Sequence, residues 1–358
     1  MKFLFVGTNP ENTGAASHFV ALAQALVEAG HPVSAVVYPD SLIAQGLADS
    51  GVRLYPAKFR NVLDLRGYAA VFKAAREQRP DWLVGNFGKE YWPLILASRL
   101  LRVPVALFRH RTPAMGALSG YLIPRLAQRF FAVSRYARQA YLDRGVPPAL
   151  VRVLYNPVNT QLCRPDAQRR GAIRRQLGIA DDAIVLGYFG RIHGGKGCFT
   201  LLDAVNQAML REPRLHCLWL GDGPDAAQLR AQIADGPTAA RHHLLGWIHD
   251  VHPYYSAISM LAFPSIAPET FGRVSIEAQA SGVPVLGSAV GGVSETLAAG
   301  VSGLLLPAGE VAPWRDAILA LCDPARREPM GAAAREFVQQ HFSTGVIAGE
   351  FVRILSDG

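Results

Sequence analysis

The sequence predicts an α/β protein built from two doubly wound parallel-sheet domains. Short apolar segments with strand character alternate with longer segments of helical periodicity, and this alternation runs in two separate series. The chain has 358 residues, more than one ordinary core organises, because domains commonly hold about 100–200 residues. Parallel sheets of this kind bind ligands at the carboxyl ends of their strands, so we expect functional residues in the strand-to-helix loops.

The first series opens with a βαβ unit. We expect a strand over 2–7, a helix over 15–29 and a second strand over 32–38. Further helices are expected over 41–50, 65–78, 92–101, 121–129 and 134–145, and further strands over 52–55, 82–85, 103–108, 130–133 and 151–155. This series predicts an N-terminal domain over residues 1–163.

The second series predicts a C-terminal domain over residues 164–341. Residues 156–180 are rich in Arg, Pro, Gln and Asp and have little strand character, so we interpret them as the linker region. The expected strands cover 183–189, 215–221, 243–245, 258–263, 285–287 and 303–306, and the expected helices cover 198–211, 225–233, 273–281, 312–322, 327–341 and 347–355.

The positive charge of the chain is concentrated in its first half. The net charge is +8; residues 1–163 hold 19 lysines and arginines against 9 acidic residues, whereas residues 164–358 hold 17 against 19. This asymmetry is consistent with ordinary solubility or with a surface that binds an anionic partner. A phospholipid surface, a phosphorylated lipid and nucleic acid all satisfy the charge argument, which does not choose between them.

Composition also indicates the compartment. No apolar run reaches the roughly 18–20 residues of a membrane helix, and the N-terminal apolar segment is too short for a signal peptide. The four cysteines show no paired metal-ligand spacing. We therefore expect a cytoplasmic protein with free thiols and without a bound metal.

One stretch, residues 264–284, stands out for its chemistry. Glu269 and Glu277 are separated by seven residues, the first in the loop after an apolar strand and the second about two turns into the following helix. The backbone N–H groups at the start of such a helix are a natural site for a phosphate. The alternative interpretation is an exposed loop acid and an acid on a helix surface.

A second stretch, Gly190–Gly197, reads GRIHGGKG and follows an expected strand. It departs from a nucleotide-binding P-loop at one position, because Gly197 stands where that motif requires a hydroxyl for Mg²⁺. An ATPase or GTPase is therefore disfavoured. Arg191 and Lys196 fit a diphosphate-binding loop, and two solvated cations on a glycine-rich turn are the alternative.

Together these motifs resemble retaining glycosyltransferases of family 4, which have the GT-B fold of two Rossmann-like domains facing each other across a cleft. The resemblance covers most of the chain and depends on the order and spacing of individually weak motifs. They are, in chain order, Gly30-His31-Pro32-Val33, Val133-Ser134, Asn156-Pro157-Val158-Asn159, Gly190-Arg191 with Lys196-Gly197, Gly221-Asp222-Gly223-Pro224, Leu245-Gly246-Trp247, Phe263-Pro264-Ser265, Glu269 with Glu277, Gly282-Val283-Pro284 and Gly291-Gly292 with Glu295.

The resemblance implies roles for the residues of the C-terminal domain. Arg191 and Lys196 would stabilise the leaving diphosphate of a nucleotide-sugar donor in place of a metal ion. Glu269 would face the donor sugar, and Glu277 would accept hydrogen bonds from the ribose. The backbone N–H groups expected to hold phosphate or sugar oxygens belong to Phe271, Gly272 and Arg273.

The resemblance also implies a half-site in the N-terminal domain. His110, at the end of an expected strand, would contact the donor sugar, and Gly14 would begin the helix that approaches the donor phosphate. The family usually has a second glycine where this chain has Ala15. Arg109 and Arg111 could bind an anionic acceptor or be solvated, and His193 could lie near phosphate. The segment 342–358 is expected to return to the N-terminal domain, as in the family.

These observations predict a retaining, metal-independent glycosyltransferase. The donor would be a nucleotide-diphosphate sugar, with UDP as the first expectation and GDP or ADP left open. The acceptor would be a saccharide or lipid-linked saccharide of the bacterial envelope, such as lipopolysaccharide core or O-antigen, reached from the inner face of the inner membrane. Nucleic acid is not an expected partner. A nucleotide-sugar epimerase and an inactive glycan- or nucleotide-binding relative are the alternatives.

Overall fold

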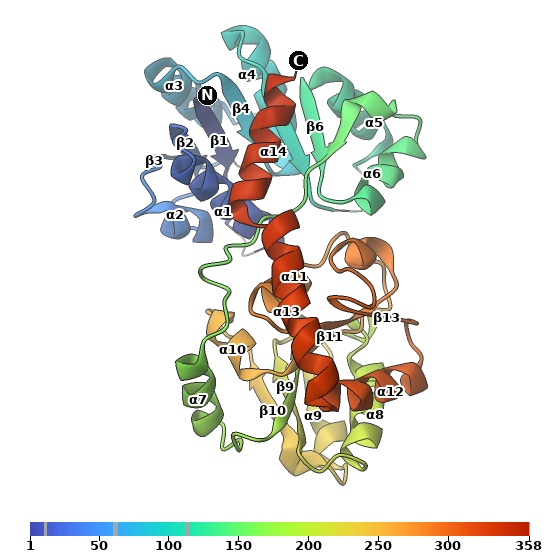
Figure 1. Cartoon of the computed structure of the whole chain (residues 1–358). Helices are drawn as coiled ribbons and strands as arrows, with labels where there is room; N and C mark the ends of the chain where they lie inside the picture. Colours follow the sequence, from blue (N-terminus) through green and yellow to red (C-terminus); the bar gives the residue numbers. More distant parts are fainter. Residues whose placement is uncertain (11–12, 60–63, 112–114, 358) are drawn as a thin grey trace. The chain divides into compact units, whose positions relative to one another are not determined.

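The chain forms two compact units. In this computed structural model, which describes residues 1–10, 13–59, 64–111 and 115–357, one unit is Met1–Pro157 with Ser343–Gly358 and the other is Val158–Phe342 (Figure 1). The predicted fold class is confirmed, because each unit contains a parallel sheet with Rossmann-like connections.

The first unit has a sheet with the strand order β3-β2-β1-β4-β5-β6-β7, in which every pairing among the described residues is parallel. Its strands are β1 (Phe3–Gly7), β2 (Val33–Val37), β3 (Arg53–Pro56), β4 (Trp82–Gly85), β5 (Val105–Arg109), β6 (Arg129–Ala132) and β7 (Val151–Val153). Its α-helices are α1 (Gly14–Glu28), α2 (Leu42–Leu47), α3 (Leu65–Gln78), α4 (Tyr91–Leu101), α5 (Ala117–Leu126), α6 (Arg135–Leu142) and α14 (Thr344–Ser356), and the short 3-10 turns are η1 (Gly88–Glu90) and η2 (Pro148–Leu150).

The last helix, α14, packs on the sheet of the first unit rather than beside the residues that precede it in the chain. Phe351 contacts Phe3, with ring centroids 5.7 Å apart, and lies in the same buried cluster. Arg129 Nε donates to the carbonyl oxygen of Ile354 at 3.2 Å. The hydrophobic face of α14 therefore completes the core of the first unit.

The second unit has a parallel sheet with the strand order β10-β9-β8-β11-β12-β13. Its strands are β8 (Ile184–Phe189), β9 (Leu215–Leu220), β10 (His242–Gly246), β11 (Met260–Phe263), β12 (Val285–Ser288) and β13 (Gly303–Leu306). Its helices are α7 (Ala167–Gln176), α8 (Cys198–Met209), α9 (Ala226–Ala234), α10 (His252–Ala257), α11 (Arg273–Ala280), α12 (Val311–Cys322) and α13 (Pro324–His341), with 3-10 turns η3 (Gly194–Lys196), η4 (Ala239–Arg241) and η5 (Gly291–Glu295).

The expected linker contains a helix that the sequence analysis missed. Helix α7 lies within residues 156–180 and holds Arg174, which is completely buried. Its guanidinium donates to the carbonyl oxygens of Ala183 and Ala257, at 2.8 and 3.1 Å. Arg174 can be buried because these carbonyl oxygens accept its hydrogen bonds. The buried side of the helix therefore carries a charged residue, and hydrophobic periodicity alone does not detect the helix.

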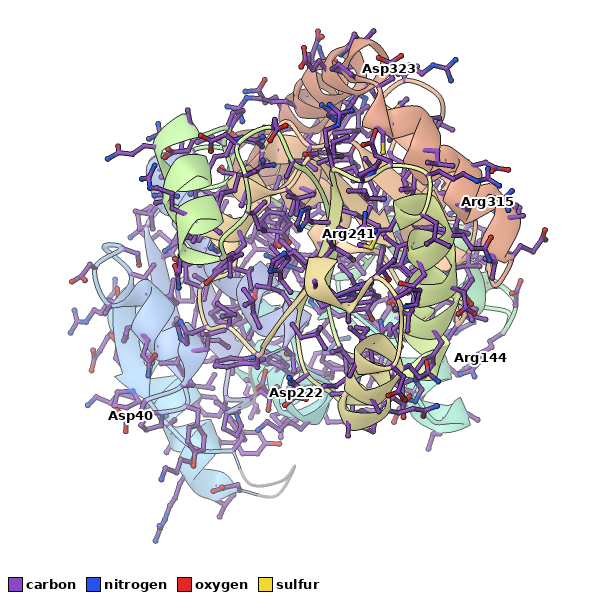
Figure 2. All side chains as sticks on the ribbon, turned by 90° about the horizontal axis from the view of Figure 1, so that it is seen from below. Asp40, Arg144, Asp222, Arg241, Arg315 and Asp323 are labelled. Atoms are coloured by element: carbon purple, nitrogen blue, oxygen red, sulfur yellow. The ribbon has the colours of Figure 1, made fainter. Side chains whose placement is uncertain are left out.

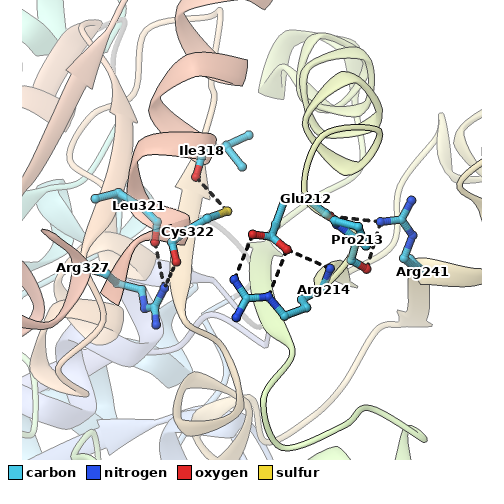
Figure 3. Close-up of polar contacts among 8 residues, drawn as sticks. All are labelled: Glu212, Pro213, Arg214, Arg241, Ile318, Leu321, Cys322 and Arg327. Carbon is cyan, nitrogen blue, oxygen red and sulfur yellow. Dashed lines mark hydrogen bonds and ion pairs between the residues drawn. The ribbon is translucent and has the colours of Figure 1, made fainter. Parts of the chain in front are cut away.

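Polar contacts also order the second unit between α8 and β9. Glu212 forms an ion pair with Arg214 at 3.0 Å, and Arg241 donates to the carbonyl oxygens of Glu212 and Pro213 (Figure 3). Arg327 donates to the carbonyl oxygens of the last two residues of α12 at 2.9 Å. These contacts lie at the amino ends of the strands and have a structural role.

Charged side chains lie at the surface of each unit, where Asp40, Arg144 and Asp323 are exposed (Figure 2). All four cysteines are buried and free. In the described part of the chain, no helix combines the length and the apolar character that crossing a membrane requires.

Candidate functional site

The predicted site residues fall at one position in each sheet. The strand order reverses between β1 and β4 in the first unit and between β8 and β11 in the second. The loops that follow these strands diverge there and leave room for a ligand at the carboxyl ends. Gly14 follows β1, His110 follows β5, and the remaining predicted residues follow β8 and β11.

The structure brings Lys196 and Glu269 into direct contact. Lys196 Nζ donates to Oε1 of Glu269, and the hydroxyl of Ser265 donates to the same oxygen at 2.6 Å. Glu269 is only 17% exposed and Lys196 37%, so this ion pair is partly shielded from water. The sequence analysis assigned Lys196 to the diphosphate of the donor and Glu269 to its sugar, and the structure places these two side chains in contact.

The loops that carry this pair are joined by backbone contacts. The N–H groups of Ile266 and Ala267 both donate to the carbonyl oxygen of Gly195, at 3.0 and 2.9 Å. Gly197 has φ +71°, and a Cβ there would lie 1.9 Å from the carbonyl oxygen of Pro264. The glycine that departs from the P-loop motif is therefore required by the close approach of two loops.

The backbone of Glu269 is positioned by a third loop. The N–H of Gly292 donates to the carbonyl oxygen of Glu269 at 2.8 Å. A Cβ on Gly291 would lie 2.3 Å from that same oxygen. The Gly-Gly pair after β12 thus lets the backbone that carries Glu269 pack directly against its neighbour.

Arg191 lies in the loop directly after β8, and its side chain is exposed. The hydroxyl of Tyr188 donates to the carbonyl oxygen of Arg191 at 2.8 Å, which orders the loop from the β-strand side. The neighbouring Gly190 approaches Gly221 so closely that a Cβ on Gly221 would lie 1.9 Å from its carbonyl oxygen. The guanidinium is therefore exposed on a backbone held by these contacts, and a guanidinium can form paired hydrogen bonds to a phosphate.

Helix α11 begins at Arg273, as expected, and Glu277 is four residues further on, which is about one turn and not the two turns of the sequence analysis. Glu277 is 7% exposed. Its Oε2 accepts from the hydroxyl of Tyr255 at 2.8 Å, and its Oε1 accepts from Arg273 Nη2 at 2.9 Å. Each oxygen retains a further lone pair that can accept a ligand hydroxyl.

The side chain of Arg273 is an addition to the prediction, which concerned only its backbone N–H. Its Nη1 is buried and has no hydrogen-bond partner among the described residues. Gly272 precedes the helix with φ +127°, and Phe271 is buried against Phe342, with ring centroids 5.7 Å apart. The start of α11 is therefore packed against its neighbours, and N–H groups at the start of a helix commonly bind anions.

In the first unit, Gly14 is the exposed first residue of α1. Thr13 caps the helix, since its hydroxyl accepts from the N–H of Ala16 at 3.4 Å. Asn12, which precedes this cap in the motif, lies outside the described residues. The capped helix start retains the geometry expected of a phosphate-binding element although Ala15 replaces a glycine.

His110 follows β5 and is partly buried. Its Nε2 lies 3.2 Å from Oδ1 of Asn86, and its ring contacts the ring of His18 with centroids 4.6 Å apart. Arg111 is exposed, whereas Arg109 is partly buried and donates through Nε to the carbonyl oxygen of Arg111 at 3.1 Å. The structure thus places His110 in an ordered polar setting.

His193 has a local structural role. It is the N-cap of η3, and its Nδ1 accepts from the N–H of Gly195 at 3.0 Å. This contact shapes the turn that carries Lys196, so the residue contributes to the site through the backbone.

A buried carboxylate, Glu90, was missed by the sequence analysis. Its Oε1 accepts from the N–H and from the hydroxyl of Thr8, at 2.6 and 2.7 Å. Burial raises the pKa of Glu90 to about 7, against the opposing effect of the Thr8 hydrogen bonds and of Lys89. Lys89 Nζ donates to the carbonyl oxygen of Thr8 at 2.8 Å. No sequence signal marks this residue, because its partner is 82 positions away.

The chemistry available to these residues is that of binding and stabilising an anion. In the second unit, two cations, a helix start and two carboxylates lie in the loops and the helix that follow β8 and β11. Among the described residues no group of three or more metal-ligating side chains comes together. This arrangement suits transfer reactions in which negative charge develops on a leaving phosphate.

Comparison with known proteins defines the class and then the family. Anabaena HepE, solved in complex with UDP, superposes over the full length of both chains with a TM-score of 0.85 at 24% identity, which defines the GT-B fold. Residues 12–162 match the model of the family described as "Glycosyltransferase Family 4", and residues 183–323 match that of "Glycosyl transferases group 1". The chain belongs to glycosyltransferase family 4.

Relatives of this chain include proteins named D-inositol 3-phosphate glycosyltransferase. The protein of Kribbella flavida is 35% identical over 207 residues, which is 54% of this chain and 48% of the relative. That of Geodermatophilus obscurus is 33% identical over 277 residues, 71% of this chain and 60% of the relative. The chain therefore spans about half to three fifths of the length of these relatives.

Proposed function

We propose that this protein transfers a sugar from a nucleotide-diphosphate donor to an acceptor hydroxyl, with retention of configuration and without a metal ion. The observation that supports this most strongly is the contact between Lys196 and Glu269, at the point where the strand order of the second sheet reverses. The exposed Arg191 is in the same loop after β8 as Lys196. Two cations there can neutralise the charge that develops on a leaving diphosphate.

The mechanism that suits these residues is substitution on one face of the sugar. The bond from the anomeric carbon to the diphosphate breaks, the acceptor oxygen forms the new bond on the same face, and its proton passes to the departing phosphate oxygen. Arg191 and Lys196 stabilise that phosphate. Glu269 is a poor nucleophile, because Lys196 and Ser265 both donate to its Oε1. Its role is to orient the sugar, while Glu277 accepts from the ribose.

UDP is the first candidate for the donor nucleotide. HepE, of the same fold, has been solved with UDP and with UDP-glucose. A saccharide or lipid-linked saccharide of the cell envelope is the proposed acceptor. A phosphorylated cyclic polyol is the second candidate, since the relatives are named for inositol 3-phosphate and Arg111 is exposed beside His110.

A ligand screen followed by an activity assay tests the proposal. UDP, GDP, ADP and their glucose conjugates are compared by thermal shift, and UDP at saturation is expected to raise the Tm by mass action. UDP release from UDP-glucose is then measured with saccharide or inositol phosphate acceptors, in the presence of EDTA. Loss of activity in EDTA would refute the metal-independent mechanism. Isomerisation of the donor in the absence of an acceptor would identify an epimerase. Nucleotide binding without UDP release or isomerisation, or no nucleotide binding at all, would identify an inactive relative.

We also propose that the first unit binds the anionic inner surface of the cytoplasmic membrane. On α4 the apolar side chains of Leu96 and Leu100 are 49% and 64% exposed, and Arg99 and Arg102 beside them are exposed cations. Helix α5 packs beside α4, since Arg99 Nη2 donates to the carbonyl oxygen of Leu126 at 3.2 Å. Exposed leucines among arginines fit a phospholipid headgroup region better than open solvent.

Co-sedimentation with vesicles checks this membrane surface. Binding is expected to increase with the anionic lipid fraction and to weaken with salt, because each cation near the surface contributes about 1 kcal/mol. Leu100→Asn combined with Arg102→Gln is expected to lower binding several-fold, while the matched change Leu210→Asn with Arg211→Gln, at an exposed site of the second unit, leaves it unchanged. Vesicle binding that does not change with the anionic lipid fraction would overturn the proposal.

A further inference from the structure

Asn86 links two elements of the first unit that carry predicted site residues. It lies one position after β4 and is 3% exposed. Its Nδ2 donates to the carbonyl oxygen of Ala15, in the first turn of α1, at 2.7 Å. Its Oδ1 lies 3.2 Å from Nε2 of His110, which follows β5. A single buried amide therefore joins the start of α1 to the histidine.

The orientation of this amide follows from its partners. A backbone carbonyl oxygen only accepts hydrogen bonds, so the atom of Asn86 that faces Ala15 must be the NH₂ group. The other end, which faces His110, is then the oxygen, and it also only accepts. The Nε2 of His110 must therefore carry a proton, and in the neutral ring the lone pair is on Nδ1.

The turn that carries Asn86 is itself held firmly. Three and four positions later, Lys89 and Glu90 bind the carbonyl oxygen and the N–H of Thr8, the residue that follows β1. Lys89 also donates to the carbonyl oxygen of Phe59 at 3.4 Å. The turn after β4 is thus bound to the loops after β1 and β3, and this fixes the place of the Asn86 amide.

A second contact joins α1 to the histidine. The ring of His18, on α1, is completely buried and meets the ring of His110 edge to face, at 63° between the ring planes. Phe108 stacks on His110 from another direction, with centroids 6.3 Å apart. These contacts restrict the plane of the imidazole, and the Asn86 amide selects which of its nitrogens carries the proton.

We propose that Asn86 is a positioning residue that holds His110 in its Nε2–H tautomer and fixes the ring relative to the start of α1. The inference rests on the proposed function, in which His110 contacts the donor sugar and α1 approaches the donor phosphate.

The tautomer is measured directly by long-range ¹H–¹⁵N NMR of protein labelled in the histidine rings, with His110→Gln used for assignment. His242 is an internal reference, because its contacts also specify a tautomer. Its Nδ1 accepts from Trp219 Nε1–H at 3.1 Å and its Nε2 lies 2.9 Å from Oδ1 of Asn206. Burial lowers the pKa of His242 to about 4, so its ring is neutral at pH 7. His110 is expected to give the same Nε2–H pattern.

Variants then test the role of the amide. Asn86→Ala is expected to give His110 a mixture of tautomers. Asn86→Asp keeps an acceptor for Nε2–H and is expected to keep that nitrogen protonated, with the ring shifted toward its charged form. The control Asn206→Ala should change the His242 signals and leave those of His110 unchanged. An Nδ1–H tautomer in the natural protein, or an unchanged His110 spectrum in Asn86→Ala, would overturn the inference. None of these results depends on whether the protein transfers a sugar.

Turnover completes the test. In the UDP-release assay, Asn86→Ala is expected to lower kcat about tenfold or more with a smaller change in KM, because the histidine would be misoriented in the transition state. Asn86→Asp should recover part of that loss. Equal activity of Asn86→Ala and the natural protein, with the tautomer changed as expected, would refute the positioning role while leaving the tautomer assignment intact.

Discussion

Replacing Lys196 with alanine is expected to lower the turnover of glycosyl transfer by at least about a hundredfold, the usual effect of removing one transition-state contact to developing negative charge. The loss has two sources. The leaving diphosphate would lose a cation, and Glu269 would lose the partner that balances its charge in a partly buried setting. UDP release at saturating donor measures the first effect, and the Tm measures the second.

Glu269→Gln is expected to give a similar loss in turnover with a different effect on binding. UDP lacks the transferred sugar that Glu269 is proposed to orient, so its Kd should rise in Lys196→Ala and change little in Glu269→Gln. The two side chains are in contact, so their effects on turnover should not multiply. The turnover of the double variant should be close to that of the slower single variant.

Two controls separate charge from packing in this experiment. Lys196→Arg keeps the positive charge and should retain part of the activity, whereas Lys73→Ala removes an exposed lysine of the first unit and should have no effect. Turnover of Lys196→Ala or Glu269→Gln within a few-fold of the natural protein would show that the site lies elsewhere. A parallel loss of Tm in all variants would instead indicate a folding defect.

The sequence predicts the elements whose determinants are local. Helix α3 and strand β4 have the predicted bounds, 65–78 and 82–85, because hydrophobic periodicity and turn residues define them. Helix α7 was missed because its buried residue, Arg174, is charged and is satisfied by carbonyl groups that belong to other segments. Hydrophobic periodicity detects helices with an apolar buried face, and it does not detect one whose buried residue carries a guanidinium.

The same distinction applies to the candidate site. The loops that carry Arg191, Lys196, Glu269 and Glu277 are marked by spacing and by glycines, so they could be found in the sequence. Their contacts could not, since the Lys196–Glu269 pair joins residues 73 positions apart. Asn86 and Glu90 carry no motif either, and only the parallel order β1-β4-β5 explains why a turn after β4 meets Thr8 and His110.

Glu90 is expected to make a large contribution to the pH dependence of stability, opposite in sign to that of the buried His242. Burial raises the pKa of Glu90 to about 7 in the folded protein, from an ordinary value of 4.5. Between these two values Glu90 binds its proton in the folded state more than in the unfolded state, so its contribution to the free energy of unfolding should fall as the pH rises through this window. The total change is about 3 kcal/mol, and above pH 7 the cost of the buried charge is fully present.

Glu90→Gln should remove this dependence. The change in unfolding free energy from pH 4.5 to pH 8, measured with urea, is expected to be more positive by about 3 kcal/mol in the variant than in the natural protein. The amide can still accept from Thr8, and its NH₂ group would replace an oxygen, Oε2, that has no partner among the described residues. That packing cost is the same at both pH values, so it cancels in the comparison.

Glu28→Gln is the matched control, because Glu28 is an exposed carboxylate in the same unit and its replacement should leave the pH dependence unchanged. The ¹³C shift of the Glu90 carboxyl gives the folded-state pKa independently, and a titration near 4.5 would contradict the expected effect. A protonated Glu90 keeps Oε1 as the acceptor for the N–H and hydroxyl of Thr8, so both forms of the carboxyl can hold the loop before α1. Glu90 can therefore take up a proton and still hold Thr8. We expect the pH to change the stability of the protein and to leave the geometry around His110 unchanged.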